Sequence, residues 1–189
     1  LDKNSPDYWA AKAYETFCKE GIIDKGIYSI YLFNIVKTQP GEAVFQDAGI
    51  PHAYLEGQNM ELMANSDNVL RGGLTPKHVD VPELLKHVEF DETIPNIMQG
   101  DLQQDGIERI YKSPAPDFEL SQLTFSNQKS YSSKSATAEV YMVVNGEVEF
   151  SNSEDVLNLK KGESVFVPAS ASYSVSSKVD AVLYKATAP

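Results

Sequence analysis

The hydrophobic pattern divides the chain into a mixed first half and a β-rich second half. Near the N-terminus, Ser5-Pro6-Asp7 combines an N-cap, a proline and a first-turn acid, which is typical of a helix start. Apolar residues then recur at helical spacing over 8–19, and Gly21 is a plausible end. A second short helix is predicted over 81–87, with Asp80 as its N-cap.

Strands are predicted where β-branched and aromatic residues gather between turn residues. In the first half these segments are 27–36, 44–45 and 61–64, and 91–117 reads as a connection with short strands. In the second half they are 118–120, 123–125, 139–144, 147–150, 164–167, 173–176 and 181–185. Asn145-Gly146 between two of them is typical of a hairpin turn. Short, closely spaced strands indicate an antiparallel sandwich or barrel.

An internal repeat connects the two halves. GEAVFQDAGIPHAY from Gly41 aligns with GESVFVPASASYSV from Gly162, with identical Gly, Glu, Val, Phe and Ala. The pattern resembles the second motif of the cupin superfamily, whose members are double-stranded β-helix jelly rolls. It therefore predicts a mainly β protein with two related jelly-roll units and a few short helices. Tyr173 stands where the first copy has His52, so the second copy is degenerate and its expected role is structural.

Composition narrows the function classes. The net charge of −11 argues against nucleic acid and anionic membranes as partners. The single cysteine, Cys18, excludes an intrachain disulfide and fits a reducing compartment, so a cytoplasmic location is expected. The sequence shows no signal peptide and no apolar run near the roughly 20 residues of a membrane span.

His52 is the candidate metal ligand. Taken alone, a histidine after proline reads as a polar turn residue, but the cupin pattern places it where a jelly roll presents a ligand. His78 and His87 read as solvated residues of the predicted helix region, and no histidine precedes residue 52. A catalytic zinc needs about three protein ligands, so this chain holds only part of a metal site.

Other chemistry-bearing residues follow His52. Arg71 and Lys77 are six residues apart on a glycine-containing loop, where both could face one anionic ligand or simply balance the acidic surface. Tyr54 would share the face of His52 on a strand. Glu61 lies among apolar residues, either on the exposed face of a strand or buried for a purpose. Asp67-Asn68 reads as a turn that aims the following loop.

A longer resemblance joins these residues. The chain is similar to the signature of type I mannose-6-phosphate isomerase (phosphomannose isomerase) over residues 21–88. The matching residues are Gly41-Glu42-Ala43, Pro51-His52-Ala53-Tyr54-Leu55, Gly57, Glu61, Ser66-Asp67-Asn68, Arg71, Gly73-Leu74-Thr75-Pro76-Lys77 and Asp80-Val81-Pro82. The match extends upstream to Ile30-Tyr31-Leu32-Phe33-Asn34.

The resemblance implies a function and roles. The family interconverts mannose 6-phosphate and fructose 6-phosphate by proton transfer between C1 and C2 through a cis-enediol, with zinc orienting the sugar oxygens. It implies that His52 is a zinc ligand and Arg71 the catalytic arginine. Tyr54, Glu61 and Lys77 would line the substrate cleft. The general base is not identified, although Glu61 is a candidate.

The chain departs from the family because the other three zinc ligands, a glutamine, a histidine and a glutamate, have no match. It therefore resembles the C-terminal part of the enzyme, with 1–112 as a partial catalytic cupin unit and 113–189 as a degenerate jelly roll. The missing N-terminal portion would supply the other ligands, and the chain alone would be inactive. A non-catalytic sugar-binding or structural cupin module is the alternative. An iron-dependent dioxygenase is disfavoured because its site needs more histidines.

Overall fold

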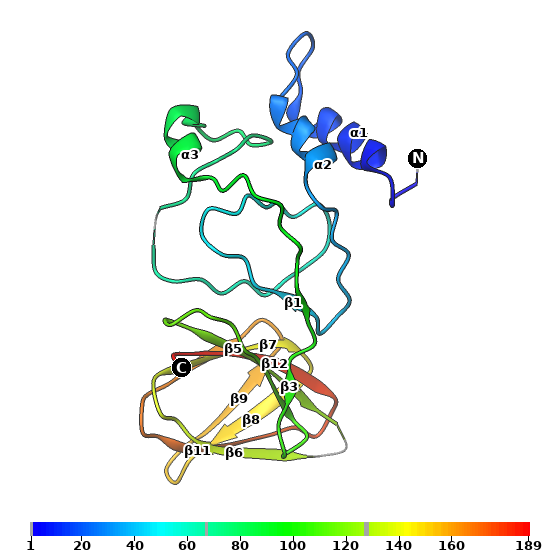
Figure 1. The fold of residues 1–189 in the computed structure, drawn as a ribbon. Coiled ribbons are helices and arrows are strands. Elements are labelled where there is room, and N and C mark those ends of the chain that lie inside the picture. The colour runs from blue at the N-terminus through cyan, green and yellow to red at the C-terminus, as the bar shows by residue number, and fades with distance from the viewer. Residues whose placement is uncertain (1, 67, 127–128) are drawn as a thin grey trace. The chain divides into compact units, whose positions relative to one another are not determined.

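The computed structural model describes residues 2–66, 68–126 and 129–189, which form two compact units (Figure 1). Unit 1 comprises Leu1–Gln39, Val44–Asn59 and Asn65–Ile97, and unit 2 comprises Pro40–Ala43, Met60–Ala64 and Met98–Pro189. Helices occur in unit 1, and nearly all strands occur in unit 2. The mainly β fold with a few short helices is thus confirmed.

The two predicted helices of unit 1 are confirmed. Helix α1 spans Pro6–Phe17, and the Ser5 side chain accepts a hydrogen bond from the Asp7 backbone N–H, as an N-cap does. Helix α3 spans Val81–His87, with Asp80 accepting from the Glu83 N–H. Helix α1 ends four residues before Gly21.

The strand predicted over 27–36 is wrong. A 3-10 helix, η1 (Lys25–Tyr28), and a short helix, α2 (Ser29–Leu32), occupy the first part of this stretch. Ile27 and Ile30 both pack on the core around Trp9. Side chains three residues apart share one face of a helical turn but lie on opposite faces of a strand, so packing against α1 selects the helix.

The rest of the first half of the chain has little regular structure. Strand β1 (Ala43–Val44), close to the predicted 44–45, pairs with β2 (Ile97–Met98) in a two-stranded sheet. The strand predicted over 61–64 is wrong, because these residues are irregular and hydrogen-bond in no ladder. Asp67, half of the predicted Asp67-Asn68 turn, lies outside the described residues.

Unit 2 is built from two antiparallel sheets. The six-stranded sheet has the order β10-β7-β12-β5-β4-β3, and the four-stranded sheet has the order β6-β11-β8-β9. The strands are β3 (Asp101–Leu102), β4 (Glu108–Tyr111), β5 (Glu119–Phe125), β6 (Ser130–Lys134), β7 (Glu139–Asn145), β8 (Glu147–Ser151), β9 (Val156–Lys160), β10 (Ser164–Val167), β11 (Ser172–Ser176) and β12 (Ala181–Thr187). All seven strands predicted after residue 117 are present, two of them merged in β5. The sequence missed β6 and β9.

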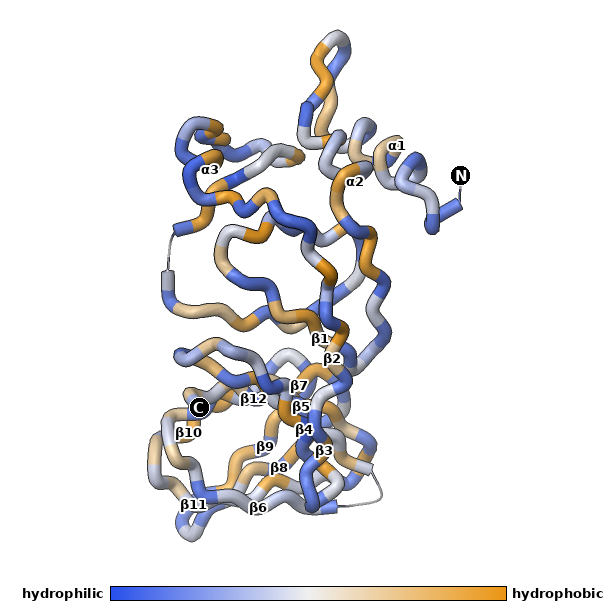
Figure 2. Tube along the Cα trace, in the orientation of Figure 1, coloured by the Kyte–Doolittle hydropathy of each residue, from blue (hydrophilic) through white to orange (hydrophobic). Residues whose placement is uncertain are grey.

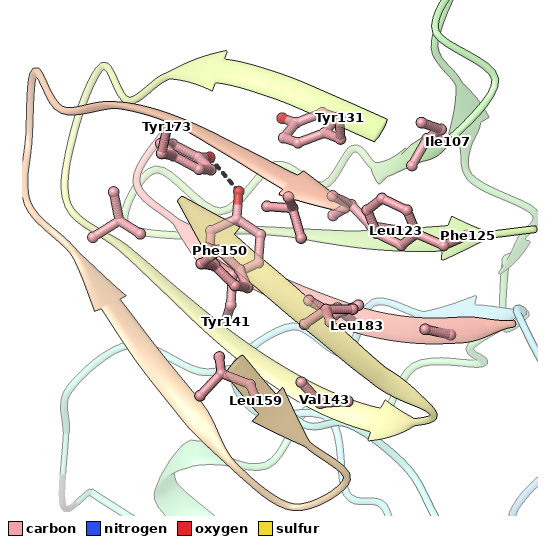
Figure 3. Close-up of a cluster of buried hydrophobic side chains, with 14 residues drawn as sticks. Ile107, Leu123, Phe125, Tyr131, Tyr141, Val143, Phe150, Leu159, Tyr173 and Leu183 are labelled. Carbon is pink, nitrogen blue, oxygen red and sulfur yellow. Dashed lines mark hydrogen bonds between the residues drawn. The ribbon is translucent and has the colours of Figure 1, made fainter. Parts of the chain in front are cut away.

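Alternate residues of these strands fill the space between the sheets. On β12, Ala181 and Leu183 are buried while Val182 and Tyr184 are partly exposed, which is the period of two expected of a half-buried strand. Figure 2 shows that both apolar and polar residues occur along the strands of unit 2. The resulting core contains Leu123, Phe125, Tyr141, Val143, Val175 and Leu183, all 0–1% exposed (Figure 3).

Asn145-Gly146 is a turn, but the hairpin predicted around it is wrong. Strand β7 before the turn belongs to the six-stranded sheet, and β8 after it belongs to the four-stranded sheet. Gly146 has φ +74°, as a tight turn requires, so the turn chemistry is correct. Strand β7 pairs with β10 and β12, which lie further along the chain, whereas β8 pairs with β11 and with β9, the strand directly after it. The sequence did not predict β9, so it could not reveal that β8 forms its hairpin with β9 rather than with β7.

The strand unit starts earlier than the sequence suggests. Its continuous part begins at Met98, whereas the sequence places the second unit at 113–189. Pairing of β4 with β5 draws residues 108–111 into the same sheet. The described residues between 45 and 80 contain no strand.

Candidate functional site

The residues singled out by the sequence lie on irregular backbone. His52, Tyr54, Arg71 and Lys77 belong to unit 1, whereas Glu61 belongs to unit 2. Irregular segments that present polar side chains are the common carriers of binding and catalytic groups. Each residue is therefore described by its own contacts.

The His52 ring is held by its own backbone. Nδ1 lies 2.9 Å from the carbonyl oxygen of Ile50, and the side chain is exposed. A carbonyl oxygen can only accept a hydrogen bond, so Nδ1 carries the proton and Nε2 keeps its lone pair. Metal-binding histidines typically use this arrangement, in which one ring N–H donates to a carbonyl and the other nitrogen binds the ion.

Tyr54 lies beside His52. The two ring centroids are 6.2 Å apart with an interplanar angle of 55°, and Tyr54 is 59% exposed. The strand that would have placed them on one face is absent, yet the irregular backbone brings the two rings together. A phenol next to an imidazole offers a hydroxyl to a polar ligand bound at that histidine.

The segment from Arg71 to Lys77 is a compact loop. Gly73 has φ +127° and Leu74 has φ +50°, and the Lys77 N–H donates to Thr75 Oγ1 at 3.2 Å. Arg71 is partly buried and Lys77 is exposed. Neither cation forms an ion pair with any carboxylate within the described ranges. Both are therefore free to bind an anionic group.

Glu61 is exposed on irregular backbone, which settles the alternative between a solvent-facing and a buried carboxylate. The Glu61 carboxylate oxygens can therefore accept hydrogen bonds from a ligand that reaches this segment from solvent.

The described residues do not assemble a metal site. Nowhere among residues 2–66, 68–126 and 129–189 do three His, Cys, Asp or Glu side chains come close enough to hold an ion. His87 pairs with Glu83 at 3.0 Å on α3, and His78 is exposed beside that helix, so both match the expectation of solvated helix-region residues. A zinc ion bound to His52 would need ligands from outside this set.

The sequence missed a polar cluster inside unit 2. Lys185 Nζ forms a short ion pair with Glu108 Oε1, and the Tyr131 hydroxyl donates to Glu108 Oε2 at 3.0 Å. Nearby, the Tyr173 hydroxyl donates to Glu139 Oε2 at 2.6 Å. Lys185 follows Ala181 and Leu183 at intervals of two along β12, so it lies on the same buried face of the strand. This spacing is the sequence feature that could have predicted a buried lysine.

Two buried tyrosines complete this cluster. The Tyr141 and Tyr173 hydroxyls are hydrogen-bonded to each other, as the dashed line in Figure 3 marks. Burial raises the pKa of both phenols well above the usual range, and the pKa of Tyr131 rises for the same reason. Tyr173 thus fills the place that His52 has in the first copy of the repeat and packs into the core, which agrees with a structural role.

In the part of the chain that the structure describes, every helix is too short or too polar to cross a membrane.

Comparisons with known proteins agree with this picture. Residues 108–184 match the family described as "Mannose-6-phosphate isomerase, cupin domain". The mannose-6-phosphate isomerase of Escherichia coli (strain K12) is 41% identical over 149 residues, which are 79% of this chain and 38% of that protein. Mannose-6-phosphate isomerase 2 of Arabidopsis thaliana is 36% identical over 165 residues, 86% of this chain and 37% of that protein.

Solved structures point the same way. A mutant of phosphomannose isomerase from Salmonella typhimurium has a TM-score of 0.81 at 33% identity, covering 99% of this chain and 47% of that one. Mannose 6-phosphate isomerase from Salmonella typhimurium bound to substrate (F6P) and zinc has a TM-score of 0.73 at 35% identity, covering 87% of this chain and 42% of that one. The chain spans less than half the length of these relatives. It is therefore a homologue of the C-terminal part of the mannose-6-phosphate isomerases.

Proposed function

We propose that this chain is part of an aldose-ketose isomerase that interconverts mannose 6-phosphate and fructose 6-phosphate. The observation that carries the proposal is the His52 ring, whose Nδ1–H is bonded to the Ile50 carbonyl so that Nε2 is free to bind a metal. A Salmonella homologue binds F6P and zinc, which supports the same ligands here.

The other residues of the site take their roles from charge and placement. Arg71, a partly buried guanidinium with no ion pair among the described residues, stabilises negative charge on the enediol oxygens as the proton moves between C1 and C2. Lys77 and Tyr54 bind the substrate as a point charge and a hydroxyl. Glu61 is an exposed carboxylate that also contacts the substrate and is the candidate base. Zinc, when bound, supplies Lewis-acid polarisation of the sugar oxygens.

The site needs residues beyond this chain. His52 supplies one zinc ligand, and the remaining ligands come from the N-terminal portion that the longer relatives possess. The apolar surface of unit 1 supports such a partner, because Ile22, Tyr28, Leu32, Phe90 and Ile94 are 67–84% exposed. Apolar colour follows the chain through α2 and beyond (Figure 2). The chain alone is therefore inactive.

A non-catalytic sugar-binding or structural module is the second candidate. The observation that favours it is the lack of any group of three metal-binding side chains among the described residues. Arg71 and Lys77 disfavour it, because neither forms an ion pair within the described ranges and a purely structural module does not require two such cations on one loop.

Placement in the cell follows from composition. One cysteine and a net charge of −11 fit a cytoplasmic protein that acts on a small molecule of carbohydrate metabolism rather than on nucleic acid or membranes.

The test is turnover of mannose 6-phosphate by the complete protein, purified with and without zinc. Arg71→Ala should lower kcat by about 100- to 1000-fold, as loss of one oxyanion-stabilising group does. Lys86→Ala is the matched control, because Lys86 pairs with Glu83 on the exposed face of α3. Normal turnover in Arg71→Ala would remove Arg71 from the reaction, and no turnover in the complete wild-type protein would favour the structural module.

A further inference from the structure

Asp24 joins two segments that are 50 positions apart in the sequence. One carboxylate oxygen, Oδ1, accepts from the Gly26 N–H at 2.8 Å and so caps the 3-10 helix η1. The other, Oδ2, accepts from the Leu74 N–H at 3.0 Å. Both bonds are partly buried, where charge-assisted hydrogen bonds are stronger than neutral ones. A single side chain therefore ties η1 to the loop from Arg71 to Lys77.

Two glycines allow the backbones to meet at this point. A Cβ atom on Gly26 would lie 2.9 Å from Leu74 N, and a Cβ on Gly73 would lie 2.9 Å from Gly26 Cα. Both distances are shorter than real Cβ contacts allow, so neither position accepts a larger residue without movement of the loop.

Leu74 is held in an unfavourable conformation. Its φ of +50° lies in the left-handed region, which costs a residue with a Cβ roughly 1–2 kcal/mol. Its side chain packs against the core of Trp9, Ala10, Ala13 and Ile30. Such strain persists only where the surroundings hold it, and here the Asp24 bond and the core contact hold the backbone and side chain of one residue.

We propose that Asp24 is a positioning residue that fixes the loop carrying Arg71 and Lys77. Arg71 lies three residues before Leu74 and Lys77 three residues after it, so the clamped Leu74 sets where both cations point. The inference rests on the proposed function of these two cations. A carboxylate is required because both of its oxygens accept, whereas an amide offers one acceptor and turns a donor toward the second N–H.

The experiment compares Asp24→Asn with wild type in the complete protein. Amide hydrogen exchange at Gly26 and Leu74 should become faster. The value of kcat/KM for mannose 6-phosphate should fall by about 100-fold, as small misplacements of catalytic groups do. Both kcat and KM should change, because Arg71 and Lys77 move together. Asp24→Glu, which keeps two accepting oxygens, should recover part of the loss.

Matched controls separate positioning from general instability. Asp7→Asn makes the same chemical change in the same unit, and its partner, the Tyr31 hydroxyl, can still donate to the amide oxygen, so kcat/KM should stay at the wild-type value. Gly73→Ala should reduce kcat/KM much more than Gly72→Ala, because a Cβ on Gly72 would meet only Leu84 Cδ2 at 3.8 Å.

Each outcome is decisive. Unchanged exchange at Leu74 in Asp24→Asn would show that the clamp is absent and overturn the proposal. Faster exchange with wild-type kcat/KM would overturn the positioning role while leaving the proposed function intact. Full turnover in Arg71→Ala would instead defeat the proposed role of Arg71, and the positioning role would fall with it.

Discussion

Ser170 and Gly49 adopt the same left-handed backbone conformation, with φ +68° and φ +79°, at aligned positions of the internal repeat. Gly41 and Gly162, which begin the two copies, match even more closely, with φ +87° and φ +88°. A serine with φ in the left-handed region is uncommon. Ser170 adopts this conformation at the position where the first copy has Gly49, which indicates that the turn was inherited with the repeat. The two copies therefore share a positive φ at both of these aligned positions.

His52 should be required for zinc binding by the complete protein. His52→Ala removes an imidazole nitrogen from the ion, so zinc affinity should fall by more than the roughly 10–100-fold that loss of an outer-shell partner costs. His78→Ala is the control, since His78 is exposed near α3. Zinc content after dialysis, measured by atomic absorption, checks the prediction. Equal zinc content in the two variants would contradict it.

The buried ion pair of unit 2 should be costly to break on one side only. Lys185→Met leaves Glu108 charged and buried, which should lower the free energy of unfolding by about 3–5 kcal/mol. Adding Glu108→Gln to this variant removes the buried charge and keeps an acceptor for the Tyr131 hydroxyl, so the double variant should recover part of the lost unfolding free energy.

Lys112→Met provides the comparison for that pair. Lys112 lies 3.4 Å from Asp101, and both side chains are more than 60% exposed. Its loss should change the unfolding free energy by no more than about 1 kcal/mol. Urea unfolding of wild type and of the three variants measures the change in unfolding free energy. Equal losses in Lys185→Met and Lys112→Met would show that burial of the ion pair does not affect its contribution to stability.

Unit 2 should lose stability in alkaline solution. Burial raises the pKa of Tyr131, Tyr141 and Tyr173, and it raises that of Tyr111 to about 12. Burial is the largest single influence on the pKa of Lys185 and lowers it, but the hydrogen bond to Glu108 and the charges of Glu108, Tyr131 and Glu139 together raise that pKa above its usual value. The unfolded chain therefore releases these protons first, near pH 10, and above that pH the native state binds more protons than the unfolded state.

It follows that the stability from these groups is fully present below about pH 10 and declines as pH rises above it. Urea midpoints between about pH 8 and about pH 11 should fall in the upper part of the range. Tyr141→Phe, which removes one buried phenol, should reduce the steepness of the fall. A midpoint that does not change with pH would contradict the assignment.

The turn between β7 and β8 should tolerate no side chain. Gly146→Ala places a methyl group against the carbonyl oxygen of Asp180 and also forces a Cβ into φ +74°. The expected loss is about 3 kcal/mol of unfolding free energy, combining backbone strain and a steric clash. Gly162→Ala meets nothing within 4 Å and carries only the cost of φ +88°, about 1–2 kcal/mol. Thermal unfolding measures both losses. A larger loss of stability in Gly162→Ala than in Gly146→Ala would contradict the tight packing of the turn between β7 and β8.

The sequence by itself determined the elements that depend on near neighbours. The starts of α1 and α3 follow from caps and prolines, and most strands of unit 2 follow from their β-branched and aromatic residues. Both signals lie within a few residues of the element. The long signature from Gly41 to Lys77 also identified the family before any fold was known. The roles of His52, Tyr54, Glu61, Arg71 and Lys77 remain predictions.

The tertiary structure decided what depends on distant partners. The core around Trp9 makes the stretch after Asp24 helical rather than extended, and the partners of β7 and β8 turn an expected hairpin into a crossing between sheets. The same holds for the Lys185–Glu108 pair and for the bond from Asp24 to Leu74, whose partners are far apart in the sequence. Such contacts form only when the chain closes on itself, and no local pattern of residues encodes which distant group will be met.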